Sequence, residues 1–450
     1  MHHHPARARA RGPLTAALAA AALLAAACSG SAPGAGTSPE GQHPSSTCFW
    51  AGPYVREDDA TNFALLDTGA VYWTSSFTLP EDARLRIRGD FAHGRYQSFN
   101  AYNADGEATD ALNDAQTHAD EGSVNPYRVG ASRTAGTRGF VVTVLPDAPP
   151  ADAAARAPNT LYVSRPRNGH VEIFYRLYVP DADRGVTGGV ALPAVDVELA
   201  DGSTHGGEDA CAILDADPNV LPQSTTVPSE FEYGLLRDQP LQGEGYPAEN
   251  PPVWHKYFNP TALYACLYFN FCGGQPADSG GIYNNIDNHY VYSYLSRDFG
   301  SVAVFRGRVP LTPATRDGAG TMAAAELRYW SLCLYETYTQ RVQPQGCAYD
   351  ETLPLDAQRY YTIVASSPED RPANARPECG YGWLEWSPAG DGLNHSEDGL
   401  LLLRNMLPDA GFTQAVQNVE RPGEEPAVMG EYLPAVEYVD KAVFEARGCG

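Results

Sequence analysis

The chain has 450 residues and a formal net charge of −24, from 31 basic and 55 acidic side chains. So acidic a chain is poorly suited to the phosphates of nucleic acid or to an anionic lipid surface, and we expect neither as a partner surface. Hydrophobic residues make up 43% of the sequence, which is enough for a packed interior, and the length favours two domains over one.

The first 27 residues have the pattern of an export signal. Three arginines precede an apolar stretch, residues 14–27, that is too short to span a bilayer. Cys28 follows small residues, as in bacterial lipoproteins, whose cysteine becomes the lipidated first residue; a conventional cut is the alternative, because Leu24 stands one place early. Residues 28–47, rich in Ser, Gly and Pro, would form a flexible tether. We therefore expect a lipoprotein on the extracytoplasmic face of the cell membrane, or else a secreted protein.

Residues 48–215 are predicted to form a first, mainly β domain. Residues 71–79, 84–88, 139–144 and 171–179 are rich in β-branched and aromatic residues or alternate at period two. Pro and Gly recur at short intervals, which favours a sandwich or jelly roll over a parallel α/β sheet. Helical patterns are few and short, the best being residues 151–157 and, later in the chain, 410–419.

Residues 216–259 are predicted to link this domain to a second one, residues 260–450. The centre of the link, residues 239–253, is rich in Pro and Gly. The second domain repeats six signals of the first in the same order. They are Asp67 and Asp287, each five residues before a tyrosine; the Arg-Gly pairs at 88–89 and 306–307; R-Y-x-S at 95–98 and 328–331; β-like runs at 139–144 and 360–364; R-x-x-x-P-D at 176–181 and 404–409; and LPAV at 192–195 and 433–436.

The order of these signals predicts two tandem homologous domains, each a β-sandwich or jelly-roll-like fold with few short helices. We expect LPAV to begin a strand, with Leu192 and Leu433 buried and the following proline fixing the turn. For the arginine of R-x-x-x-P-D two roles are open: an ion pair with its own aspartate, or a fork that binds a ligand carboxylate.

The cysteines are typical of an exported protein. Nine are present, and removal of Cys28 leaves eight, which suggests four disulfides in an oxidising compartment. We expect Cys48 and Cys211 to join the ends of the first domain. Cys333 and Cys347 flank a hairpin and form the second expected pair. Because Cys449 corresponds to Cys211, its expected partner is Cys266 or Cys272, while Cys379 is left unassigned.

No catalytic or cofactor motif is present in the sequence. It has no G-x-S-x-G, H-E-x-x-H, phosphate-binding loop or dinucleotide fingerprint. The cysteines contain no C-x-x-C pair, and the eight histidines outside the N-terminal H-H-H run are scattered singly, so we expect no metal and no cofactor. The acidic loop 105–121 lacks calcium-loop spacing and is best explained as a solvated loop.

The strongest candidate for a ligand site lies at residues 283–290, YNNIDNHY. Asn and Asp side chains flanked by tyrosines can bind a polar ligand, with amides and a carboxylate for its hydroxyls and rings for an apolar face. The predicted site residues are Asn284, Asn285, Asp287, His289 and Arg328. The alternative is an Asx-rich turn that leads into a strand, with the side chains bonded to their own backbone.

The same residues resemble a pair of domains of unknown function that is common in bacterial exported proteins. Its N-N-D-T-L-Y-type motif matches residues 284–290, and its R-Y-W-S-type motif matches residues 328–331. The chain departs from the first motif through an extra Ile286 and through Asn288-His289 in place of Thr-Leu. It is also similar to uncharacterised actinobacterial lipoproteins that carry the Y-W-S-L-C run of residues 329–333. The resemblance implies a β-sandwich fold and export, and no specific activity.

Taken alone, the sequence favours an envelope protein that acts as a binding or structural module for a small polar or carbohydrate ligand. The alternative is an extracellular hydrolase or lyase with its site in the second domain, at Asn284, Asp287, His289 and Arg328.

Overall fold

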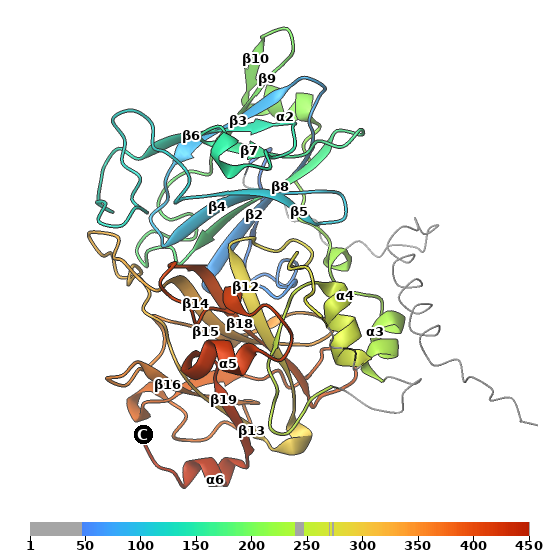
Figure 1. The fold of residues 1–450 in the computed structure, drawn as a ribbon, viewed down its shortest axis with the longest axis vertical. Coiled ribbons are helices and arrows are strands. Elements are labelled where there is room, and N and C mark those ends of the chain that lie inside the picture. Colours follow the sequence, from blue (N-terminus) through green and yellow to red (C-terminus); the bar gives the residue numbers. More distant parts are fainter. Residues whose placement is uncertain (1–46, 239–246, 270, 272–273, 450) are drawn as a thin grey trace, which may run out of the picture. The chain divides into compact units, whose positions relative to one another are not determined.

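The structure is a computed structural model that describes residues 47–238, 247–269, 271 and 274–449 (Figure 1). The expected signal, Cys28, most of the tether, and Cys272 lie outside the described residues. The described residues all belong to one compact unit, residues 42–450. None of the helices within these residues is both long and apolar enough to cross a membrane.

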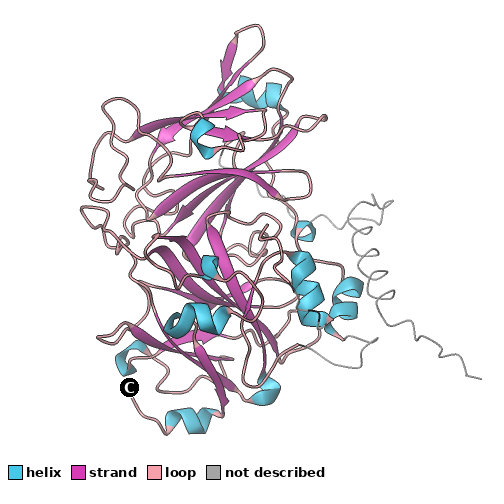
Figure 2. Ribbon diagram, in the orientation of Figure 1, coloured by secondary structure: helices cyan, strands magenta, loops and turns pink. Residues whose placement is uncertain are grey.

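The first pair of sheets, here called the first sandwich, is built from the N-terminal half of the described chain (Figure 2). Residues of both sheets, such as Trp73, Ile87, Phe99 and Val142, share one buried core. One sheet has the order β1 (Ala51–Tyr54), β2 (Ala70–Thr78), β8 (His170–Tyr178), β4 (Tyr96–Tyr102), β5 (Ala108–Asn113). The other has the order β10 (Thr204–Gly206), β9 (Ala194–Glu198), β3 (Arg84–Asp90), β6 (Gly139–Leu145), β7 (Thr160–Tyr162).

The second pair of sheets, the second sandwich, has a core of its own around Trp330, Leu332, Ile363 and Leu403. One sheet has the order β11 (His255–Lys256), β12 (Asn288–Ser296), β18 (Asp398–Pro408), β14 (Leu327–Tyr335), β15 (Val342–Tyr349). The other has the order β17 (Gly382–Glu385), β16 (Tyr360–Ser366), β13 (Val302–Arg308), β19 (Ala435–Val439). The expected fold class, mainly β with sandwich-like pairs of sheets, is confirmed. The first strand of this sandwich, β11, begins before residue 260, where the sequence placed the start of the second domain.

The two sandwiches have matching strand orders. β1-β2-β8-β4-β5 corresponds to β11-β12-β18-β14-β15, and β9-β3-β6-β7 corresponds to β19-β13-β16-β17. Even the exception to antiparallel pairing is repeated, because β6–β7 and β16–β17 are both parallel. The sequence repeats therefore fall on equivalent strands.

LPAV has an additional role that its pattern did not predict. The Trp50 indole donates a 2.8 Å hydrogen bond to the Pro193 carbonyl, and the Trp254 indole donates a 2.9 Å bond to the Pro434 carbonyl. Strands β9 and β19 begin at the next residue, as expected. The prolines, whose carbonyls accept these bonds, are buried, whereas Leu192 and Leu433 are only half-buried and not buried as expected.

Helices are short throughout the described chain. Residues 151–157 and 410–419 contain only single 3₁₀ turns, η1 (Ala153–Ala155) and η6 (Val416–Asn418). A capping box of Ser229 and Glu232 starts α3, in the segment that joins the sandwiches. The helices are α2 (Gly207–Leu214), α3 (Glu230–Arg237), α4 (Pro260–Leu263), α5 (Glu425–Met429) and α6 (Lys441–Glu445), with further short turns at η2 (Gln223–Thr225), η3 (Tyr264–Tyr268), η4 (Arg297–Phe299), η5 (Pro377–Cys379) and η7 (Gly430–Tyr432).

Three disulfides are seen among the described residues. Cys48–Cys211 and Cys333–Cys347 form as expected. Cys449 bonds to Cys379, so its expected pairing with Cys266 or Cys272 is wrong. The reason is that the second sandwich has no cysteine before Trp254 to match Cys48 before Trp50, and the C-terminal end turns instead to the loop before β17. Cys266 is itself disulfide-bonded. Disulfides of this number indicate an oxidising, extracytoplasmic compartment.

The sandwiches contact each other through two equivalent arginine–carboxylate ion pairs, with one arginine from each sandwich. Arg95, whose side chain is fully buried, donates to both carboxylate oxygens of Asp350 at 2.7 and 2.6 Å and also pairs with Glu351. Its counterpart Arg328 pairs with Asp114 at 2.7 Å. Between these pairs, residues from both sandwiches form an apolar cluster: Ala70, Tyr96, Tyr178, Val179, Tyr329 and Met406.

We expect Arg95→Met to lower the free energy of unfolding by about 3–5 kcal/mol, because it leaves Asp350 buried beside Glu351 without a cation. The matched control is Arg306→Met, since Arg306 is 59% exposed and lies 3.6 Å from Asp356. That change should cost less than about 1 kcal/mol. Urea denaturation with the disulfides intact measures both, and equal losses would contradict the role given to Arg95.

Candidate functional site

Residues 283–287 of the predicted site segment, residues 283–290, lie against the first sandwich. The Tyr102 hydroxyl donates to the Asn284 carbonyl at 2.7 Å. The Tyr96 hydroxyl lies 3.1 Å from Asn285 Oδ1 and 2.7 Å from Asp287 Oδ2. Asp287 also accepts a 2.9 Å bond from the amide of Asn113. These side chains therefore hold the two sandwiches together, which neither sequence-based interpretation anticipated.

The equivalent segment of the first sandwich, residues 63–69, makes the corresponding contacts with the second sandwich. Asp67 accepts from the Tyr329 hydroxyl at 2.7 Å and from the Ser331 hydroxyl at 2.6 Å. The Leu65 carbonyl accepts from Arg404, as the Tyr283 carbonyl accepts from Arg176. Leu65 and Tyr283 both have a left-handed backbone, with φ of 56° and 52°. Each domain thus supplies acceptors to the other.

This equivalence corrects the sequence alignment of Asp67 with Asp287. Counting from the left-handed residue places Asp67 opposite Asn285, and Gly69 opposite Asp287. The strand pairing agrees, because Tyr72 pairs with Arg176 and Tyr290 with Arg404. A side chain at Gly69 would overlap the Tyr329 hydroxyl, so the first repeat has no room for an aspartate there.

The ion pair within R-x-x-x-P-D, one of the two roles left open for its arginine, does not form between Arg176 and Asp181. Arg176 donates to the Tyr102 hydroxyl at 2.5 Å and to the Tyr283 carbonyl at 2.6 Å, and its guanidinium lies over the rings of Tyr72, Tyr102 and Phe174. Asp181 pairs instead with Arg133 at 2.5 Å. The repeated arginine therefore holds a loop of the neighbouring sandwich. Its guanidinium group is occupied by these contacts and is not directed at a ligand carboxylate.

The five predicted site residues occupy two places. Asn285, Asp287 and Arg328 meet the first sandwich, where Arg328 donates to Asp114 at 2.7 Å and to the Arg95 carbonyl at 3.2 Å. Asn284 joins them through its carbonyl. His289 lies elsewhere: its Nδ1 is 3.2 Å from Asp278, which also binds Lys256 at 2.7 Å. These residues do not form one site.

Burial dominates the electrostatics of this junction. It raises the pKa of Asp114 to about 6, although the Arg328 guanidinium acts in the opposite direction. Burial also raises the pKa of Asp287, against the hydrogen bonds from Asn113 and Tyr96. The charge of Asp287 contributes to the raised pKa of Asp114, so the two carboxyl groups are neighbours that share one arginine.

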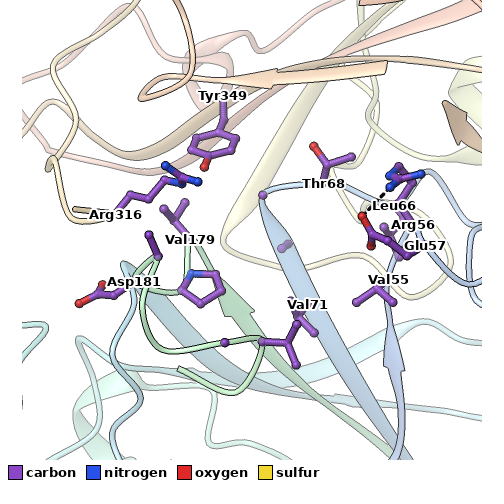
Figure 3. A pocket seen from close by; sticks show the side chains of 16 residues that line it. Val55, Arg56, Glu57, Leu66, Thr68, Val71, Val179, Asp181, Arg316 and Tyr349 are labelled. Carbon is purple, nitrogen blue, oxygen red and sulfur yellow. Dashed lines mark hydrogen bonds and ion pairs between the residues drawn. The ribbon is translucent and has the colours of Figure 1, made fainter. Parts of the chain in front are cut away.

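A cavity of about 300 Å³ lies beside the junction (Figure 3). Its apolar wall comes from the first sandwich and includes Val71, Val179 and Val186, while Arg316 and Tyr349 of the second sandwich lie across from Val71. None of the five predicted site residues lines it. Its polar side chains are those of Arg56, Glu57, Thr68, Asp181, Arg316 and Tyr349.

Among the charged side chains of this cavity, Arg316 has the weakest ion pair. Its guanidinium lies 3.8 Å from Asp317, which is 90% exposed. By contrast, Arg56 binds Glu57 at 2.6 Å and Asp181 binds Arg133. The backbone of Arg316 is fixed, since its amide bonds to Glu351 and its carbonyl accepts from Ala182. A fixed backbone with a weakly paired guanidinium is suited to an anionic ligand group.

The sequence did contain a signal for Arg316. The repeated Arg-Gly and R-Y-x-S signals are separated by 5 residues in the first domain (90–94) and by 20 in the second (308–327). The extra residues form the loop between β13 and β14 that carries Arg316. A loop added to one repeat only is a natural place for function, because loops carry binding residues on a rigid scaffold.

Comparisons with known proteins do not supply a function. No protein-family model matches the chain, and no curated protein matches it. Among solved structures, an uncharacterised protein from Burkholderia cenocepacia is similar with a TM-score of 0.47 and 11% identity, over 89% of this chain and 84% of that one. A protein from Vibrio parahaemolyticus has a TM-score of 0.39 and 12% identity, over 84% of this chain and 90% of that one.

The raised pKa of Asp114 predicts a pH dependence of stability. A carboxyl group with a higher pKa in the folded state favours folding when protonated, so its contribution is full below about pH 4 and is lost as pH rises to about 6. Relative to Asp114→Asn, wild type should therefore gain up to roughly 3 kcal/mol between pH 7 and pH 4. Denaturation at several pH values measures this, with Asp317→Asn as the exposed control. Parallel curves for wild type and Asp114→Asn would contradict the assignment.

Proposed function

We propose that the protein is an extracytoplasmic binding module that captures a small polar ligand bearing a carboxylate in the cavity beside the domain junction. The observation that carries the proposal is the weakly paired guanidinium of Arg316 at a cavity built by both sandwiches. The volume of the cavity, about 300 Å³, is at the lower end of the range for ligand-binding pockets, which fits a single sugar acid or a short hydroxy acid.

The lining can recognise both parts of such a ligand. The planar guanidinium of Arg316 can bind a carboxylate through two parallel hydrogen bonds. The hydroxyl groups of Thr68 and Tyr349 can bond ligand hydroxyls, and Val71 and Val179 offer an apolar wall. Burial raises the pKa of Tyr349, so its phenol stays protonated and able to donate.

The same lining favours binding over the hydrolase or lyase alternative. The cavity's acids are already engaged, Glu57 by Arg56 and Asp181 by Arg133. The groups proposed for catalysis are divided, with Asp287 and Arg328 in the junction and His289 beside Asp278. A general acid or base directed into the cavity is therefore not available among these residues.

A thermal-shift screen of residues 47–450 tests the ligand class. We expect sugar acids or short hydroxy acids to raise the melting temperature, and a ligand at 100 times its Kd stabilises by about 2.7 kcal/mol. Arg316→Gln should remove the rise in melting temperature, because the glutamine amide carries no charge and cannot form the two parallel hydrogen bonds of a guanidinium with a carboxylate. Arg128→Gln is the matched control, since Arg128 is exposed and outside the cavity. A shift retained by Arg316→Gln, or given by neutral sugars alone, would refute the proposal.

We also propose that a lipid on Cys28 anchors the protein to the membrane, as the signal sequence predicts. Cys28→Ser should move the full-length protein from the membrane fraction to the soluble extracytoplasmic fraction or the medium, because the thiol that carries the lipid is absent. Fractionation followed by immunodetection measures the change. Equal membrane association of both forms would contradict a lipid anchor.

A further inference from the structure

A second group of polar side chains lies in the loop between β17 and β18, where it meets α3. Asp391 is completely buried, and its Oδ1 accepts backbone bonds from Leu393, Asn394 and His395 at 2.7 to 3.0 Å. Its Oδ2 lies 2.7 Å from His395 Nδ1. Since a carboxylate can only accept, it holds Nδ1 in the protonated form and leaves Nε2 as the ring atom that faces outward.

Helix α3 completes this group from another part of the chain. An Asp238 oxygen lies 3.7 Å from His395 Nε2, and Arg237 donates to both oxygens of Asp398 at 3.1 and 3.2 Å. Asp391, His395 and Asp398 each contribute an atom within 4.8 Å of the others. Three carboxylates and one imidazole face one arginine, so the group carries an excess of negative charge.

Tyr233 adds a buried hydroxyl to this group. It also lies on α3 and is only 5% exposed, and its hydroxyl bonds to the buried carboxylate of Asp391. Burial raises its pKa, and the charges of Asp391 and Asp398 raise it further, so the hydroxyl lies beside both carboxylates. A tyrosine hydroxyl can donate one hydrogen bond and also accept, so next to these carboxylates it can bond a water molecule on a bound ion as well.

We propose that these residues bind one divalent transition-metal ion of the zinc type. His395 Nε2 and one oxygen each of Asp398 and Asp238 are the ligands, Asp391 orients the imidazole, and the Tyr233 hydroxyl bonds a water in the remaining position. Imidazole with carboxylates is a ligand set that zinc accepts. An imidazole that donates its second nitrogen to a carboxylate is the usual outer-sphere arrangement at zinc.

The arrangement also explains why no metal motif was recognised. His395 and Asp398 are close in the sequence, but Asp238 comes from the segment between the domains, far away in the chain. Arg237 stays bonded to the other oxygen of Asp398, so the ion and the arginine share that carboxylate. A bound ion would thereby fasten α3 to the β17–β18 loop.

Calorimetric titration of metal-free residues 47–450 with Zn²⁺ at pH 7.5 tests this proposal. We expect one equivalent of zinc to bind and the melting temperature to rise. His395→Gln and Asp238→Asn should each weaken binding at least about tenfold, the effect seen when a metal site loses part of its shell. Because Asp238 is 58% exposed, its substitution leaves the fold intact and keeps the test valid.

Two controls make the outcome specific. His118→Gln removes an exposed histidine outside the group and should bind zinc as wild type does. Arg316→Gln should do the same, which separates this site from the ligand cavity. Three outcomes would each overturn the proposal. They are the absence of saturable zinc binding, a zinc affinity of the His395→Gln and Asp238→Asn variants equal to that of wild type, and binding of Ca²⁺ in preference to Zn²⁺.

Discussion

The buried contact of Arg95 with Asp350 and Glu351 defines how this molecule is put together. Each sandwich has one sheet whose outer face is polar and aromatic, and that face becomes buried only because the other sandwich covers it. A buried guanidinium requires its counter-charge, and here the counter-charge comes from the other domain. Arg176 and Arg404 follow the same rule with carbonyl acceptors. The arginines that recur in both repeats are therefore residues that each domain supplies to its neighbour.

Much of the fold could be predicted because it depends on local pattern. Alternation and turn residues indicated the β class, and the order of the repeated signals placed them on equivalent strands. Cys333 and Cys347 could be paired because they lie opposite each other on adjacent strands of a hairpin. The partner of Cys449 could not, since it depends on where the C-terminal end returns in space. The alignment of Asp67 with Asp287 failed because sequence spacing cannot reveal which residue adopts the left-handed turn.

The candidate functional residues were harder to predict for a related reason. Asn285, Asp287 and Arg328 do have partners of the expected chemistry, but those partners are Tyr96, Asn113 and Asp114 of the same chain and not a ligand. The same types of polar residue occur at a contact between domains and at a ligand site, so the sequence alone does not distinguish the two. Arg316 carries no motif, and only the length of its loop distinguishes it. The group around His395 joins segments more than 150 residues apart, as the Arg237–Asp398 contact shows.

The differences between the two repeats have a consequence for binding of the proposed ligand. In a symmetric homodimer of a one-domain protein, the two domains would have identical sequences. Any off-axis cavity at their junction would then occur twice. Joined in one chain, the copies have diverged: Gly69 stands where the other repeat has Asp287, and the long loop with Arg316 exists on one side only. Within the described residues the first sandwich has no equivalent of the loop that carries Arg316, so this cavity is not one of a symmetric pair. Its occupancy should follow a simple hyperbola with concentration, with a stoichiometry of one and no cooperativity.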